Sequence, residues 1–131
     1  PAPAPAPTPT PAPSPGVLEA EPNDSFAAAQ VVATTTTAVS GTIASTADLD
    51  FYRVIIPAGR RIAATLTGNA AVGFGLGVYL SGTQPLGQIL ASPGQAVSFT
   101  INNSGATAVT VALRVSRSSG GTGAYKLTLA P

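Results

Sequence analysis

The chain has 131 residues, of which 8% are charged, and its formal net charge is +1. It contains no histidine and no cysteine, which excludes Ser/His/Asp and Cys/His catalysis, disulfide bonds, and zinc sites built on imidazole or thiolate. The six basic residues form no cluster beyond Arg60–Arg61, and no apolar run reaches the length of a membrane span. The sequence therefore predicts neither nucleic-acid binding nor a membrane-spanning segment.

The first segment, residues 1–16, differs in composition from the rest of the chain. Proline occupies every odd position from Pro1 to Pro15, alternating mostly with alanine and threonine. Such a tract lacks regular backbone donors and favours an extended polyproline II conformation. We interpret it as a semi-rigid linker; the alternative is an arm that docks on a neighbouring subunit. The chain begins inside this tract without a signal peptide, which is typical of a fragment or of a processed, mature form.

Residues 17–131 are predicted to form one β-rich domain. Short runs of Val, Ile, Leu and Thr are separated by turns rich in Gly, Pro, Asn and Ser. The only helical candidate is Ser25–Val31, a turn or two that Asn23 or Asp24 would cap. The expected strands number about eight: Ala38–Ile43, Phe51–Ile56, Arg61–Thr67, Gly75–Leu80, Leu86–Leu90, Val97–Ile101, Thr107–Val115 and Ala124–Leu129.

Side-chain alternation along these runs predicts which residues form the core. Within 109–115, every second residue is a branched apolar residue, which is the period of a strand with one buried face. By the same parity, Tyr52, Phe99 and Tyr125 are expected in the core. The glycine-rich run 73–77 favours a tightly packed or bulged strand over a ligand groove. Many short strands without a long helix predict an all-β sandwich or barrel.

The acidic residues are confined to two short segments. The first contains three of the five acids and the second contains two: Glu19, Glu21 and Asp24, then Asp48 and Asp50. In an extended segment, Glu19, Glu21 and Asn23 point the same way, about 6.6 Å apart from one to the next. Asp48 and Asp50 share parity at the start of an expected strand. The pattern indicates that these oxygen-bearing side chains converge.

A cluster of this composition predicts a calcium site. Calcium takes six to eight oxygen ligands from carboxylates, amide carbonyls and main-chain carbonyls. The acids and one amide suffice for one or two structural ions, with a glutamate bridging them. The candidate ligands are Glu19, Glu21, Asn23, Asp24, Asp48 and Asp50.

Purely structural roles for these acids compete with calcium binding. Acids that precede a helix can simply cap it, and an aspartate at a strand start can be a turn residue. Neither role accounts for the lack of any acid after Asp50 in the rest of the chain. Asp48 and Asp50 are formally a general acid/base pair. No nucleophile candidate lies near them, so metal binding accounts for them better and we do not expect an enzyme.

Several spaced motifs also resemble a known bacterial family, the pre-peptidase C-terminal domain. The similarity covers Leu18–Leu129 in the family's order, and the collagen-binding domains of clostridial collagenases are similar modules. The motifs are Glu19-Ala-Glu21-Pro-Asn23-Asp24-Ser25, Val39-Ser-Gly41-Thr-Ile43, Asp48-Leu-Asp50-Phe-Tyr52-Arg-Val54 with Pro57-Ala-Gly59, and the closing Gly123-Ala-Tyr125-Lys-Leu127-Thr-Leu129.

The resemblance implies a jelly-roll-like antiparallel β-sandwich in a secreted bacterial protein, beside a peptidase or another catalytic domain. In the relatives, glutamates of an E-x-E-x-N-D segment and aspartates of the later motif hold calcium and rigidify the N-terminal linker. This role carries over to the six candidate ligands, with main-chain carbonyls near Ser40 and Gly41 as further ones. Collagen binding does not carry over, because it depends on an exposed aromatic surface.

The sequence thus predicts a non-catalytic calcium-binding accessory module of a secreted or cell-surface protein, mediating binding or spacing next to another domain. Its expected partners are other domains of that protein, an extracellular protein or polysaccharide, or neighbouring copies of the chain. The alternative is a structural subunit of an extracellular filament or surface assembly, in which the Pro-rich arm docks on a neighbouring subunit.

Overall fold

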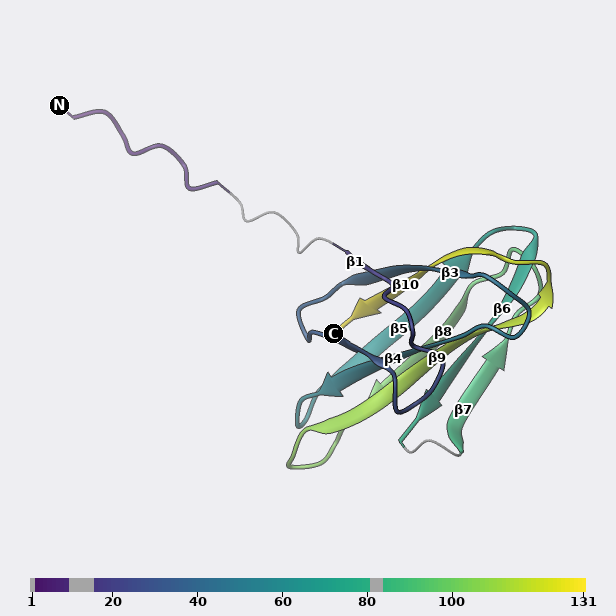
Figure 1. Ribbon diagram of the computed structural model, residues 1–131. Coiled ribbons are helices and arrows are strands. Elements are labelled where there is room, and N and C mark those ends of the chain that lie inside the picture. The colour runs from purple at the N-terminus through teal and green to yellow at the C-terminus, as the bar shows by residue number, and fades with distance from the viewer. Residues whose placement is uncertain (1, 10–15, 81–83) are drawn as a thin grey trace.

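The computed structural model describes residues 2–9, 16–80 and 84–131, and these form ten strands in two facing sheets (Figure 1). The first sheet has the order β1-β3-β10-β5-β8: β1 (Val17–Leu18), β3 (Ala38–Ile43), β10 (Gly123–Ala130), β5 (Arg61–Gly68) and β8 (Val97–Asn102). The second has the order β2-β4-β9-β6-β7: β2 (Gln30–Val32), β4 (Leu49–Ile56), β9 (Val109–Gly120), β6 (Val72–Tyr79) and β7 (Pro85–Leu90).

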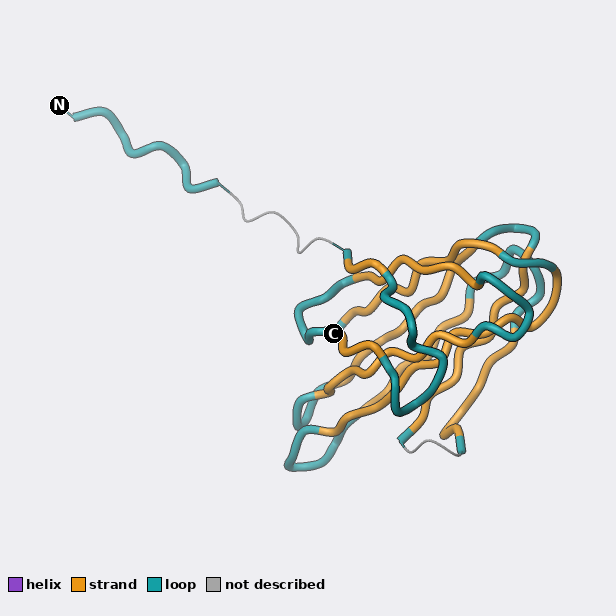
Figure 2. The backbone as a smooth tube through the Cα atoms, in the orientation of Figure 1, coloured by secondary structure: helices purple, strands orange, loops and turns teal. Residues whose placement is uncertain are grey.

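The chain passes from one sheet to the other after every strand except β6, which forms a hairpin with β7. This alternation produces the jelly-roll-like sandwich that the sequence predicts, and most of its backbone is strand (Figure 2). All pairs are antiparallel apart from β1 with β3 and β2 with β4, which are parallel. These two parallel edge strands, of two and three residues, are the ones that the sequence pattern missed.

The predicted helix at Ser25–Val31 is wrong. The chain makes a single turn, in which the backbone N–H of Ala28 donates to both the carbonyl and the hydroxyl oxygen of Ser25 at 3.1 Å. It then enters β2, which pairs with β4 from Gln30 onward. A sheet edge provides backbone partners over the whole strand, whereas a short isolated helix is marginal. Ser25, and neither Asn23 nor Asp24, caps the turn.

The core lies between the sheets and follows the predicted alternation. Tyr52 and Tyr125 are buried there, and Phe99 is half-buried against the same cluster, as expected. A second, smaller cluster lies on the outer face of the second sheet, where Phe51 and Tyr79 are covered by the segment between β1 and β2. This segment forms no strand between Glu19 and Ala29, and it carries the first three acidic residues.

The glycine-rich strand β6 is a packed strand, as the sequence favoured. Every residue from Val72 to Tyr79 is buried. A Cβ atom added to Gly75 would lie 2.7 Å from Leu90 Cδ2 and 2.8 Å from Ser116 Oγ, so neighbouring side chains fill the space above this glycine. The pairing register shifts twice along the strand, at Gly73/Phe74 and at Val78/Tyr79. The glycines permit close packing on this strand.

Of the Pro-rich arm, residues 2–9 adopt neither helix nor strand, while residues 1 and 10–15 lie outside the described part. The first strand begins at Val17. The division into an arm, 1–16, and a domain, 17–131, stays a prediction. Within the described ranges, no helix is long and apolar enough to cross a membrane.

Candidate metal centre

The acidic segment after β1 bridges the two sheets. On one side, the backbone N–H of Glu19 donates to the carbonyl of Ser40 in β3 at 2.9 Å. On the other, the N–H of Phe51 in β4 donates to the carbonyl of Asn23 at 2.9 Å. Residues 19–23 thereby cross from β3 to β4 on the side of the sandwich formed by the edge strands β1 and β2, which places Glu19 and Glu21 over Asp50.

Gln30, which the sequence did not single out, fastens this segment to the second sheet. Its side-chain oxygen accepts from the N–H of Ala20 at 2.8 Å, and its amide nitrogen donates to the carbonyl of Leu18 at 3.0 Å. Gln30 therefore links the edge strands β1 and β2, which belong to different sheets. The sequence pattern predicted a helix over Ser25–Val31 and therefore gave no sign of this role.

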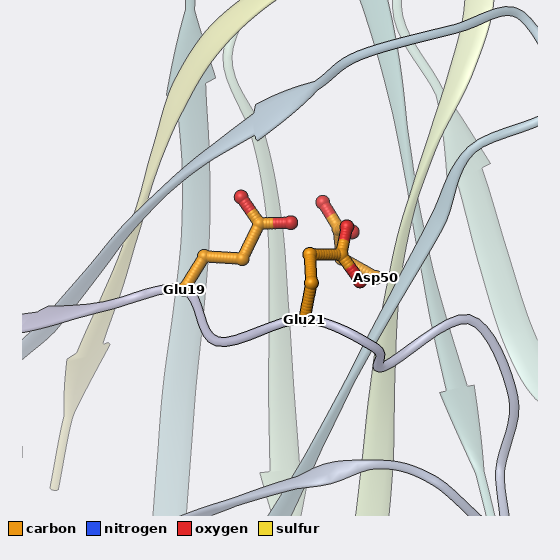
Figure 3. A group of neighbouring side chains, drawn as sticks. All are labelled: Glu19, Glu21 and Asp50. Atoms are coloured by element: carbon orange, nitrogen blue, oxygen red, sulfur yellow. The ribbon is translucent and has the colours of Figure 1, made fainter.

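Three of the predicted ligands form the inner group of the cluster. The carboxylates of Glu19, Glu21 and Asp50 point toward one another (Figure 3), with one oxygen from each lying within 4.8 Å of the others. The buried side-chain amide of Asn23 lies 2.9 Å from Glu21 Oε2 and 3.1 Å from Asp50 Oδ1. If the amide nitrogen of Asn23 faces the two carboxylates, it donates to both of them. If the amide is turned over, its oxygen faces them instead, and the amide and both carboxylates can then bind the same cation.

The remaining two ligands form an outer group with Glu21. Oxygens of Glu21, Asp24 and Asp48 also lie within 4.8 Å of one another. Glu21 belongs to both groups, the geometry expected of a bridging carboxylate. The structure brings all six predicted residues together, from fully buried Asp50 to exposed Asp24.

Backbone groups of β3 and the loop after it hold two of the acids in place. Thr42 N–H donates to Glu19 Oε2 at 2.7 Å, and Ala44 N–H donates to Asp48 Oδ2 at 2.5 Å. Asp48 is thus also a turn residue, which is one of the structural roles that compete with metal binding. The other oxygen of Glu19, Oε1, is buried and has no hydrogen-bond partner among the described residues. A buried carboxylate oxygen without a donor is costly, and a cation would satisfy it.

Gly41 makes room for this arrangement. A Cβ atom there would collide with the hydroxyl of Tyr125 and would lie 2.8 Å from Glu19 Oε2. The chemistry of the donor set also fits calcium, because every side chain offers oxygen and most carry charge. The carbonyl of Ser40, predicted as a further ligand, accepts the N–H of Glu19. A metal role for the Ser40 and Gly41 carbonyls stays a prediction.

Two buried tyrosines extend the site into the core. The hydroxyl of Tyr125 donates to Asp50 Oδ2 at 2.6 Å and contacts the hydroxyl of Tyr52. Parity correctly placed both rings in the core, but it gave no sign that their hydroxyls meet Asp50. Burial, the largest cause, raises the pKa of both hydroxyls well above the ordinary value. They remain neutral and orient one oxygen of Asp50.

The acids repel one another in the absence of a cation. Burial, the largest cause, and the adjacent Glu19 carboxylate together raise the pKa of Asp50 to about 8, against the lowering effect of the Tyr125 hydrogen bond. Desolvation likewise raises the pKa of Glu21, and the charges of Asp24, Glu19 and Asp48 add to the increase. The cluster favours binding either protons or a cation near neutral pH.

Comparison with known proteins supports the fold. No family model matches the chain, and no curated protein matches it in sequence. Among solved structures, the pre-peptidase C-terminal domain of collagenase from Bacillus anthracis is similar, with a TM-score of 0.59 and 13% identity over 78% of this chain and 94% of that one. The resemblance found in the sequence is therefore confirmed at the level of the fold.

Two further solved structures give weaker matches. One is a CBM4 structure (TM-score 0.46, 10% identity, 66% of this chain and 63% of that one). The other is PliG of Aeromonas hydrophila, a periplasmic lysozyme inhibitor (TM-score 0.45, 11% identity, 77% and 98%). At these levels of similarity, function must be argued from the site itself.

Proposed function

We propose that this chain is a non-catalytic, calcium-binding accessory module of a secreted or cell-surface bacterial protein. The observation that carries the proposal is the gathering of all five acids of the chain and Asn23 into two adjoining oxygen clusters that share Glu21. The buried, unpartnered Glu19 Oε1 is the local feature that a cation would satisfy. The proposal that the parent protein is secreted rests on the fold that this chain shares with the collagenase domain.

Calcium would act here as a structural clamp. It supplies positive charge that offsets the repulsion between the acids. Glu19, Glu21, Asn23 and Asp24 come from the segment after β1, whereas Asp48 and Asp50 come from the start of β4. Ions held by both sets tie that segment to the sandwich. The segment is the continuation of the Pro-rich arm, so its fixation sets the direction in which the arm leaves the domain.

The surroundings of the cluster argue against catalysis and against ligand stacking. Asp50 is fully buried beneath Glu19 and Glu21, and its neighbours Tyr52 and Tyr125 are neutral hydroxyls in the core. The four phenylalanines and three tyrosines all lie in the described ranges, and each is at least half-buried. Sugar- and collagen-binding surfaces use exposed aromatic rings. Spacing next to another domain therefore suits this module better than binding a polysaccharide.

Thermal unfolding of the full chain tests the proposal. Calcium at a hundredfold excess over Kd stabilises a one-site protein by about 2.7 kcal/mol, which corresponds to a rise in Tm of roughly 10 °C for a domain of this size. Magnesium should give a smaller rise, because it dehydrates less readily. Isothermal titration then measures whether one or two ions bind. An equal Tm in calcium and in chelator contradicts the proposal.

Two substitutions separate metal binding from general stability. Asp50→Asn retains the shape and a neutral side chain, so it should abolish the calcium-dependent rise while leaving the chelated protein folded. Asn103 is the control: its buried amide donates to the carbonyls of Ile56, Pro57 and Thr107, at the opposite end of β4 from Asp50. Asn103→Ala should lower Tm equally with and without calcium.

The alternative function, a filament subunit whose Pro-rich arm docks on the next copy, stays a prediction. Residues 10–15 of the arm lie outside the described part of the structure. Deletion of residues 1–15 tests it directly, because assembly by arm docking requires them. Particles that still form without the arm contradict this alternative.

A further inference from the structure

Among the residues that the structure describes, one edge strand of the sandwich, β7, is neither covered nor charged. It ends the second sheet, and within the described ranges it pairs only with β6. It lies beside β8, the edge of the first sheet, yet no hydrogen bond joins the two strands in the described residues. Three of its side chains are large, apolar and accessible: Leu86 and Leu90 are 63% and 62% exposed, and Ile89 is 37% exposed.

The three strands β6, β7 and β8 carry no charged residue of their own. No charged residue occurs between Arg61 and Arg114, a stretch that contains β6, β7 and β8. Soluble β proteins ordinarily guard a long edge strand with lysine or another charge, with proline, or with a covering loop. Among the described residues, β7 has a proline and a bulge at its start and otherwise lacks these devices. Such an edge is a ready template for another strand.

The hydrogen bonds between β7 and β6 define which backbone N–H and C=O groups of β7 can pair with a further strand. Ala91 N–H donates to the carbonyl of Phe74 in β6 at 2.9 Å. Because alternate residues of a strand turn their backbone groups to opposite sides, those of Ile89 also face β6. The N–H and C=O groups of Gln88 and Leu90 then face outward. Pro85, which has no N–H, pairs with Tyr79 beyond the register shift and therefore lies outside this regular row.

The usable part of the edge is self-complementary. The bulge opposite Val78/Tyr79 interrupts the regular ladder at Leu86, so regular backbone runs from Gly87 to Ala91. Its midpoint is Ile89. An antiparallel copy placed on a two-fold axis through Ile89 sets Gln88 opposite the partner's Leu90 on both sides of the axis. All four outward backbone groups of each chain then find partners.

We infer that β7 is a homodimer interface, in which β7 of a second copy of this chain pairs antiparallel with it about a two-fold axis at Ile89. The two second sheets become one continuous sheet of ten strands. Side-chain packing supports the same occupant: Ile89 meets its own copy, and the leucines beside it face an equally uncharged surface. A charged partner strand would leave its charges desolvated against this edge.

A cysteine pair tests the axis, because the native chain has no cysteine. Residues facing each other in a non-hydrogen-bonded antiparallel pair have Cα atoms about 4.5 Å apart, which lies within the range that a disulfide spans, about 4.4–6.8 Å. Ile89→Cys in the full chain should form a covalent dimer at least tenfold faster than Thr100→Cys, which places an exposed cysteine on the neighbouring edge strand β8. Equal rates for the two variants overturn the inference.

Sedimentation of the full chain measures the association itself. Wild-type protein should pass from monomer to dimer as its concentration rises from about 1 µM to 1 mM. Leu90→Lys should weaken association at least tenfold, and Thr100→Lys should change it less than twofold. Hydrogen exchange at rising concentration should protect the amides of Gln88 and Leu90. A monomer at every concentration overturns the inference, as does concentration-independent exchange; protection of β7 only by an added foreign peptide would assign the edge to that partner instead.

Discussion

The two lateral sides of the sandwich deal with exposed edge strands in opposite ways. On the β1/β2 side, Gln30 connects the edge strands, and the carboxylate of Glu19 accepts the outward N–H of Thr42. On the β7/β8 side, no hydrogen bond connects the edges among the described residues, and no charge guards them. One side uses polar side chains to close itself; the other leaves its backbone groups available.

Charged residues are few in this chain, and they are distributed unevenly between the two sides. All acids serve the β1/β2 side, where they hold the segment that follows the arm. The acids cannot also guard β7. If both proposals hold, the stability of the closed side should depend on cations and pH, and pairing at the open side should depend on protein concentration. Perturbing one side should leave the other unaffected.

The largest effect is expected at Gly41, which lies beneath the closed side. Gly41→Ala puts a methyl group into the space occupied by the Tyr125 hydroxyl and Glu19 Oε2. Because both neighbours are held by hydrogen bonds, we expect a loss of about 3 kcal/mol in the free energy of unfolding. Chemical denaturation measures it. Gly121→Ala is the control, since nothing lies within 4 Å of a Cβ at that glycine.

The result for Gly41 would also bear on calcium. Displaced Glu19 and Tyr125 can no longer position the ligands, so the variant should bind calcium more weakly. Dimer formation through β7, on the other side of the sandwich, should persist in the protein that remains folded. A variant as stable as wild type would show that the acidic cluster is looser than the structure has it.

A smaller effect is expected from pH in the presence of chelator. The folded-state pKa of Asp50, about 8, lies above its ordinary value of 3.8. The folded state therefore keeps a proton that the unfolded state loses, so stability is fully present below about pH 4 and falls as pH rises toward 8. Tm in chelator should drop by several degrees between pH 5 and pH 8.

Two controls locate this pH dependence on the closed side. Asp50→Asn should flatten the profile, because the amide does not titrate. Saturating calcium should oppose the decline, because deprotonated acids bind the ion better. If the chelated wild-type protein becomes more stable from pH 5 to pH 8, Asp50 does not hold its proton in the folded state.

The sequence predicted the core better than the edges, for a physical reason. Strands such as β3 and β10 bury one face, and the alternation of Tyr125, Leu127 and Leu129 with exposed residues records that burial directly. The edge strands β1 and β2 bury little, so they leave no such pattern. Their existence depends on backbone pairing with β3 and β4, which only the folded chain provides.

The candidate site likewise combines features that the sequence predicted with features that it did not. The oxygen ligands were recognisable because acids are rare in this chain and fall in two segments. The hydroxyl of Tyr125 reaches Asp50 across 75 positions, and Gln30 reaches back to Leu18 across 12. Neither contact has a local signature, because each depends on which strands become neighbours. Sequence reasoning identified the candidate ligands that lie together in the structure and missed the groups that position them.

The smallest effect should come from matched glutamines on the two sides. Gln30→Ala removes two hydrogen bonds that join β1 to β2 and should cost about 1 kcal/mol. Gln88→Ala truncates an exposed side chain on β7 and should change stability by less than about 0.5 kcal/mol. Denaturant midpoints of dilute, monomeric protein measure both. Hydrogen exchange should show faster opening of the Thr42 amide in Gln30→Ala alone. Equal losses of unfolding free energy at the two positions would mean that the Gln30 hydrogen bonds do not stabilise the β1/β2 side. The two sides would then differ only in charge.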